Sequence, residues 1–178
     1  VALIFPGARL WFDAIREWDA LVETLAGAGV DRVHLHHVHG LPPAVLDLPR
    51  RLDAACWLTL HDFFPACPSY HLKDASLRFC GGLPDCGKCL ESGASAWGGG
   101  VDGWRERFGA LLARCERVIA PSADAARRLR EFFPDATPAV WPHPRDRDAA
   151  RLPRLRVLVP GAISVEKGLD LLEACVED

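Results

Sequence analysis

The sequence has no excess of positive charge, no long apolar run and no internal repeat. Its 178 residues contain 21 Lys and Arg against 24 Asp and Glu, which gives a formal net charge of −3. Nucleic acid is therefore disfavoured as the main partner, because a phosphate backbone is bound by clustered positive charge. No apolar segment approaches the roughly 18 residues needed to cross a bilayer, and no export signal opens the chain. We therefore expect a cytoplasmic protein whose contact with a membrane is at most peripheral.

The composition and the order of the apolar segments predict an α/β fold. A hydrophobic fraction of 49% with 25% charged residues is typical of a globular core. Residues 54–60 (AACWLTL) form a continuous apolar run, as in strands buried on both faces of a parallel sheet. Strands are expected over 1–5, 33–38, 54–60, 117–120 and 137–141, and helices over 10–28, 42–52, 101–116 and 123–133. This alternation predicts a Rossmann-like, mostly parallel sheet with flanking helices.

Four histidines lie close together at the end of the strand predicted over 33–38. On a strand, His34 and His36 face one side, while His37 and His39 face the other. At most two of them could bind one ion without leaving strand geometry. A metal-dependent hydrolase that uses the run His34–His39 is therefore one hypothesis, and histidines that line a cleft are the simpler one.

His61 and Asp62 directly follow the apolar strand over 54–60. Parallel α/β sheets bind their ligands at the carboxyl ends of the strands. A histidine there can exchange a proton with a polar substrate, since it titrates near working pH. The alternative is a histidine that only fixes the loop through hydrogen bonds.

Two further candidate ligand-binding residues follow later strands. Ser122 begins the helix predicted over 123–133, whose N-terminal amides could hold an anion, although simple N-capping explains a serine there equally well. Lys167, in the loop after a strand that starts near residue 155, could bind a phosphate.

Cys67, Cys80, Cys86 and Cys89 fall within one Gly- and Pro-rich segment, residues 63–100. The two-residue spacing between Cys86 and Cys89 lets a tight turn direct both sulfurs to one ion. A long polar segment is expected to bury little apolar surface and to need a crosslink. We therefore predict one structural zinc ion, with two disulfides, free thiols or an iron–sulfur cluster as alternatives.

Several short motifs occur in one order along the chain: HLH at 34–36, LTLHDF at 58–63, VIAPS at 118–122, VLVPG at 157–161 and EKGLDLL at 166–172. In this series the sequence resembles the retaining glycosyltransferases of family 4. That family has the GT-B fold, in which two Rossmann-like domains face a cleft. The resemblance implies an acceptor-side domain over 1–143 with a Cys-rich insertion at 63–100, a linker over 144–154, and the first strand and helix of the donor-side domain over 155–178.

The resemblance also implies site residues and substrates. His61 matches the family's histidine near the transferred sugar, and Lys167 matches its lysine at the nucleotide diphosphate. Ala162 stands where the family usually has an arginine, so one diphosphate contact is missing or supplied elsewhere. With Asp62 and Ser122 also expected at the substrate, we predict transfer of a sugar from a nucleoside-diphosphate donor to a glycan or lipid-linked acceptor. The chain alone is expected to be inactive, and a zinc-stapled binding module without enzymatic activity is the rival hypothesis.

Overall fold

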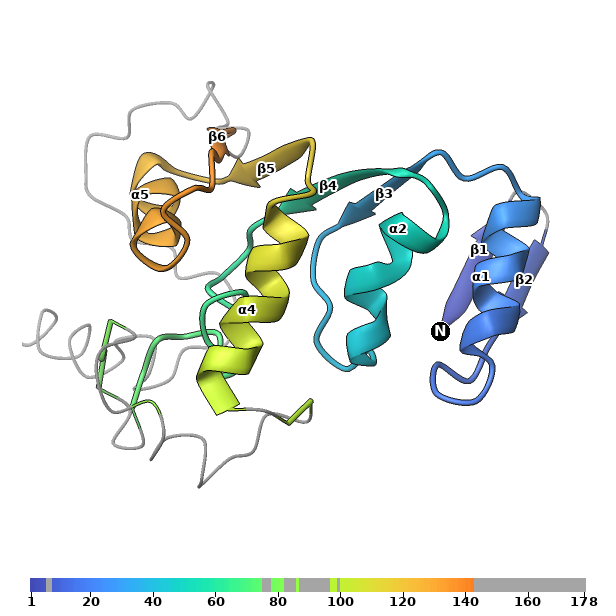
Figure 1. The fold of residues 1–178 in the computed structure, drawn as a ribbon, viewed down its shortest axis with the longest axis horizontal. Helices are drawn as coiled ribbons and strands as arrows, with labels where there is room; N and C mark the ends of the chain where they lie inside the picture. Colours follow the sequence, from blue (N-terminus) through green and yellow to red (C-terminus); the bar gives the residue numbers. More distant parts are fainter. Residues whose placement is uncertain (6–7, 75–77, 82–85, 87–96, 99, 143–178) are drawn as a thin grey trace, which may run out of the picture. The chain divides into compact units, whose positions relative to one another are not determined.

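The structure is a computed structural model that describes residues 1–5, 8–74, 78–81, 86, 97–98 and 100–142 (Figure 1). The chain divides into two compact units, Val1–His143 and Pro144–Asp178, and every described residue belongs to the first. The predicted linker at 144–154 and the predicted donor-side segment at 155–178 therefore lie outside the described residues.

A four-stranded parallel sheet forms the centre of the first unit. It consists of β3 (Arg32–Leu35), β4 (Ala55–Thr59), β5 (Arg117–Ala120) and β6 (Ala139–Val140), in that order across the sheet. The connections carry the helical segments η1 (Pro43–Asp47), α2 (Leu48–Arg51), α4 (Gly100–Leu112) and α5 (Ala123–Phe132). Parallel neighbours need such long crossovers. The predicted α/β fold with a mostly parallel sheet and flanking helices is thus confirmed.

The core lies on one face of this sheet. Along β3 and β4 burial alternates, so that Val33, Leu35, Cys56 and Leu58 are buried while their neighbours are more exposed. Helix α4 lies, in Figure 1, on the same side of the sheet as α2. It adds an apolar stripe at helical spacing, made of Trp104, Phe108, Leu111 and Leu112.

The N-terminal part differs from the sequence prediction. Strands β1 (Ala2–Phe5) and β2 (Ala8–Trp11) form an antiparallel pair, and helix α1 (Trp18–Gly27) begins only afterwards. The predicted helix over 10–28 is therefore wrong in its first turns. Asp13 explains the delay: its Oδ1 accepts the backbone N–H groups of Ile15 and Arg16 at 2.8 and 3.0 Å, which closes a turn before the helix.

The first part of the Cys-rich segment packs into the core. Phe64, Ala66 and Leu72 are buried. Trp104 Nε1 on α4 donates to the carbonyl oxygen of Phe64 at 2.7 Å, and Arg105 Nε donates to that of Ala66 at 2.9 Å. The expectation that this segment buries little apolar surface is thus wrong for its beginning, because α4 supplies both apolar contacts and hydrogen-bond donors.

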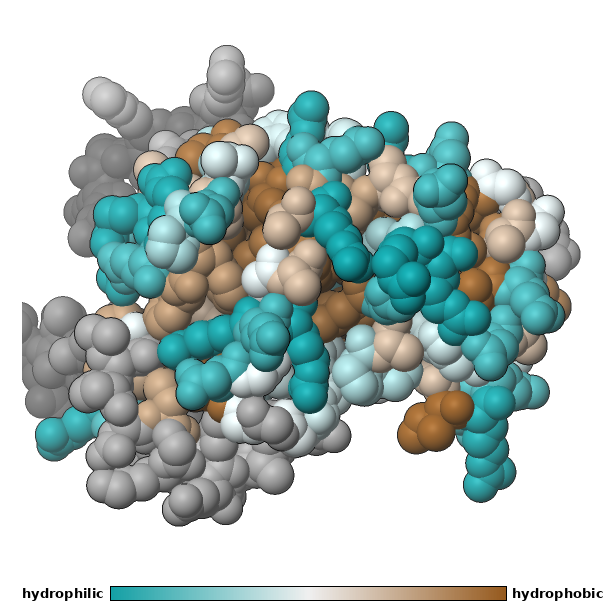
Figure 2. Space-filling view, in the orientation of Figure 1, coloured by the Kyte–Doolittle hydropathy of each residue, from teal (hydrophilic) through white to brown (hydrophobic). Residues whose placement is uncertain are grey.

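The surface carries mixed polarity. On the face in Figure 2, hydrophilic side chains are interspersed with smaller hydrophobic areas. Within the described part of the chain, every helix is too short or too polar to span a lipid bilayer.

Candidate functional site

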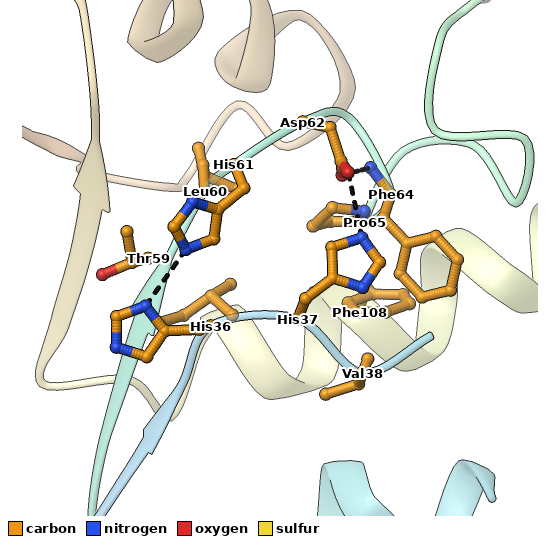
Figure 3. Close-up of a pocket in the computed structure, with 11 residues that line it drawn as sticks. His36, His37, Val38, Thr59, Leu60, His61, Asp62, Phe64, Pro65 and Phe108 are labelled. Carbon is orange, nitrogen blue, oxygen red and sulfur yellow. Dashed lines mark hydrogen bonds and ion pairs between the residues drawn. The ribbon is translucent and has the colours of Figure 1, made fainter. Parts of the chain in front are cut away.

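A pocket lies where β3 and β4 end (Figure 3). Its polar lining comes from the two segments that follow these strands, and its apolar lining from the core below. The lining residues are His36, His37, Val38, Leu58, Thr59, Leu60, His61, Asp62, Phe64, Pro65 and Phe108. Its volume is about 20 Å³, which is room for about one water molecule. The pocket is therefore a small recess with polar groups on a mostly apolar lining, and it cannot enclose a sugar ring by itself.

Three side-chain pairs join the end of β3 to the end of β4. His34 Nε2 lies 2.8 Å from Thr59 Oγ1, His36 Nδ1 lies 3.0 Å from His61 Nε2, and His37 Nε2 lies 2.9 Å from Asp62 Oδ2. The members of each pair are 25 residues apart. In the parallel register His34 lies opposite Trp57, so each histidine reaches a side chain two residues beyond the position opposite it, and the separation stays constant because parallel strands advance together.

Strand β3 ends at Leu35, so the strand predicted over 33–38 is too long, and His36, His37 and His39 lie in the segment that follows it. The rings of His34 and His36 lie 4.2 Å apart, and those of His37 and His39 lie 6.0 Å apart, measured between centroids. The ring contacts thus pair the histidines as expected, but three of the four lie beyond the strand on which the expectation rested. Partial burial lowers the pKa of His34, and positive charge on His36 and His61 lowers it further.

Both nitrogens of His37 and both carboxylate oxygens of Asp62 form local hydrogen bonds. His37 Nδ1 accepts the backbone N–H of His39 at 3.0 Å, so Nε2 carries the proton that is donated to Asp62. The other carboxylate oxygen of Asp62 accepts the backbone N–H of Phe64 at 2.8 Å. These contacts hold together the two loops that form the pocket.

The predicted site residues are found at different places. His61 is exposed, follows β4 and lines the pocket beside Asp62. Ser122 is the N-cap of α5, where its Oγ accepts the backbone N–H of Ala125 at 3.1 Å. Lys167 lies outside the described residues. The structure thus brings together His61 and Asp62, and it explains Ser122 as a cap.

Metal binding finds no support within the described residues, where His, Cys, Asp and Glu form no group of three suited to hold an ion. For the hydrolase hypothesis, the histidines instead bond to one another, to Thr59 and to Asp62. For the zinc prediction, Cys89 lies outside the described residues. Cys67 Sγ lies 3.0 Å from Ser69 Oγ, Cys80 donates to the carbonyl oxygen of Leu72, and Arg105 lies 3.7 Å from Cys86 Sγ.

Sequence reasoning missed the partners of the candidate residues. Neither the contact between His36 and His61 nor the one between His34 and Thr59 was expected. The signal that could have found them is the matching order of polar residues, 25 positions apart, at the ends of two strands predicted to belong to one parallel sheet.

The comparisons with known proteins agree with the resemblance drawn from the motifs. Curated proteins and solved structures give no significant match to this chain. A family model described as glycosyltransferase family 4 matches residues 1–149, a range that includes β1 to β6 and the whole pocket. Since this match covers most of the 178 residues, the chain belongs to glycosyltransferase family 4.

Proposed function

We propose that this glycosyltransferase domain transfers a sugar from a nucleoside-diphosphate donor to a glycan or lipid-linked acceptor, with His61 in contact with the substrate. The observation that carries the proposal is the position of His61. It lines a pocket at the carboxyl ends of two parallel strands, the edge where such sheets bind ligands. The chain's membership of glycosyltransferase family 4 makes a sugar the corresponding ligand.

The chemistry requires two tasks that this pocket can share. The leaving diphosphate must be stabilised by cationic or helix-terminal groups, and the acceptor hydroxyl must be held against the sugar. His61 supports the second task, because an imidazole can donate or accept a hydrogen bond to a sugar hydroxyl. Since the recess has room for about one water molecule, groups outside its lining must complete the substrate site. Lys167 is proposed as one of them, at the diphosphate.

Asp62 is proposed to support the site mainly through its loop. Both of its carboxylate oxygens already accept hydrogen bonds, from His37 and from Phe64. A carboxylate oxygen can accept a second bond, so Asp62 can also receive a substrate hydroxyl. Ser122 caps α5 with its Oγ, which leaves the same atom able to accept or donate one further bond.

Three further parts of the hypothesis stay predictions: a cytoplasmic location, inactivity of the chain by itself, and one structural zinc ion bound by Cys67, Cys80, Cys86 and Cys89. The histidine-based metal hydrolase is the weaker alternative, because His34, His36 and His37 each form a hydrogen bond to a partner side chain after or at the end of β4.

The test is a transfer assay with the full-length protein. A panel of nucleoside-diphosphate sugars is offered with glycan and lipid-linked acceptors, and both nucleoside-diphosphate release and the glycosylated product are measured. The proposal expects both products in equal amounts from at least one donor. Hydrolysis of a substrate that requires an added divalent metal, with no transfer from any donor, would favour the hydrolase instead.

A further inference from the structure

We propose that His36 is a positioning residue for His61. His36 binds Nε2 of His61, so that Nδ1 of His61 is the atom that meets the substrate. The inference rests on the proposed function, since that function assigns the substrate contact to His61. Its basis is one contact in Figure 3: His36 Nδ1 lies 3.0 Å from His61 Nε2. The ring centroids lie 5.3 Å apart with 29° between the planes, so the rings meet edge to edge, as a hydrogen bond between ring nitrogens requires.

The His61 side chain needs a partner, because only the backbone next to His61 is anchored. The preceding residue, Leu60, is buried and donates its N–H to the carbonyl oxygen of Ile119 at 2.8 Å, so β5 fixes the chain at this point. The side chain of His61 itself is exposed. Exposed side chains change rotamer within nanoseconds, and a loosely held group loses much of its catalytic value. The bond to His36 restricts this motion.

The geometry also decides which nitrogen of His61 is available. A hydrogen bond between two imidazoles uses one N–H and one lone pair, whichever ring donates. Nε2 of His61 is therefore occupied in both arrangements. Nδ1 of His61 has no hydrogen-bond partner among the residues that the structure describes. A substrate hydroxyl can use this nitrogen without breaking the contact with His36.

The pair can also take up a proton without losing its alignment. Both nitrogens of an imidazolium are donors, so the bond survives when one ring is protonated and breaks when both are. His37 contrasts with this arrangement, because Asp62 and the backbone of His39 occupy both of its nitrogens. His37 is thus a structural link between loops, whereas His36 leaves its partner one nitrogen free.

Two substitutions of His36 separate positioning from direct substrate contact. In His36→Asn the side-chain amide lies as many bonds from the backbone as Nδ1 does, so it can keep the bond to His61. In His36→Gln the amide lies one bond further out, at the place of Nε2, and the bond is lost. We expect kcat of His36→Asn to stay within about threefold of the wild type, and that of His36→Gln to fall by about ten- to a hundredfold. KM for the donor should change less than kcat in both variants.

The experiment uses the full-length protein, the donor selected from the panel, and His71→Ala as a matched control. His71 is exposed, its ring lies against Tyr70, and it is not among the residues that line the pocket. Combining His36→Gln with His61→Ala should add little to the loss caused by His61→Ala alone, since the partner is then absent. Thermal unfolding of each variant shows which losses of turnover are caused by unfolding. If His36→Gln proves unstable, the turnover of His36→Asn is used instead.

The outcomes distinguish this inference from the proposed function. A large loss in His61→Ala with wild-type turnover in His36→Gln would overturn the positioning role and leave the proposed function intact. The reverse order, with Gln active and Asn inactive, would mean that His36 itself contacts the substrate through Nε2. Wild-type turnover in His61→Ala would overturn the substrate contact assigned to His61, and this inference with it.

Discussion

His37 donates from Nε2 to the carboxylate of Asp62 at 2.9 Å, and this bond joins the loop after β3 to the loop after β4. On either side of it, His37 Nδ1 accepts the N–H of His39 and Asp62 Oδ1 accepts the N–H of Phe64. The bond thus links two loops, and in each loop a backbone N–H donates to the side chain that makes the link. The first prediction tests this link.

Replacing Asp62 by Asn should lower the free energy of unfolding by about 1 kcal/mol, the usual scale for one hydrogen bond. The Asn oxygen can still accept the N–H of Phe64, but its NH₂ group then faces the donor of His37. His37→Ala should cost a similar amount. Denaturant unfolding of both single variants and of the double variant measures the effect. Losses that simply add in the double variant would show that the two side chains do not act through a shared bond.

Ser122→Ala should destabilise the protein by about 1 kcal/mol, because the Oγ that caps α5 is removed. Ser122→Asp should keep the stability, since aspartate caps helices as well as serine does. If Ser122 also binds substrate, the Ala variant will in addition have a raised KM for donor or acceptor. Unchanged thermal stability of the Ala variant would contradict its role as a cap.

His34 should make the protein less stable in mild acid. Its pKa in the folded protein is lowered, first by burial and then by His36 and His61, from an ordinary value of about 6.5. Between the two pKa values the unfolded chain binds more protons, so stability rises with pH there. The contribution of His34 to the free energy of unfolding is intact above about pH 6.5. It is lost as the pH falls through the pKa of His34 in the folded protein.

The variant His34→Gln should flatten this dependence, because glutamine does not titrate and its amide can replace Nε2 opposite Thr59. Denaturant unfolding at pH 5, 6 and 7 gives the comparison. A slope of stability against pH equal to that of the wild type would show that His34 does not contribute.

The sequence predicted the elements whose signals are local. Strand β5 was placed at its observed bounds, and α5 was expected to start after Ser122, because an apolar strand and an N-cap can be read from adjacent residues. The start of α1 was missed. Leu10 and Trp11 fit the helical spacing of the residues that follow, although both are exposed and belong to β2. Spacing alone does not report burial.

The candidate site was predicted in its residues but not in its contacts. His61 and Asp62 were found because they follow an apolar strand. Their pairing with His36 and His37 depends on the register of β3 against β4, which is set by tertiary packing. The buried start of the Cys-rich segment was missed for the same reason, since Trp104 on α4 lies 40 residues from Phe64, whose carbonyl it binds.

The zinc prediction is tested by elemental analysis of protein purified without added metal. We expect about one zinc per chain, held by four thiolates in a closed tetrahedral site. A Cys86→Ser, Cys89→Ser double variant should lose the metal and become sensitive to protease between residues 63 and 100. Absence of zinc from the wild type, or zinc retained in the double variant, would refute this prediction.

The central claim is that His61 contacts the substrate of a sugar-transfer reaction, and the most direct test is the turnover of His61→Ala. The full-length variant is compared with the wild type and with His71→Ala at saturating donor and acceptor. The account predicts that His61→Ala loses turnover by about 100-fold or more, the scale of a positioned polar or acid–base group, while His71→Ala and the thermal stability of both variants stay near the wild type. Sugar transfer by His61→Ala at the wild-type rate would contradict it.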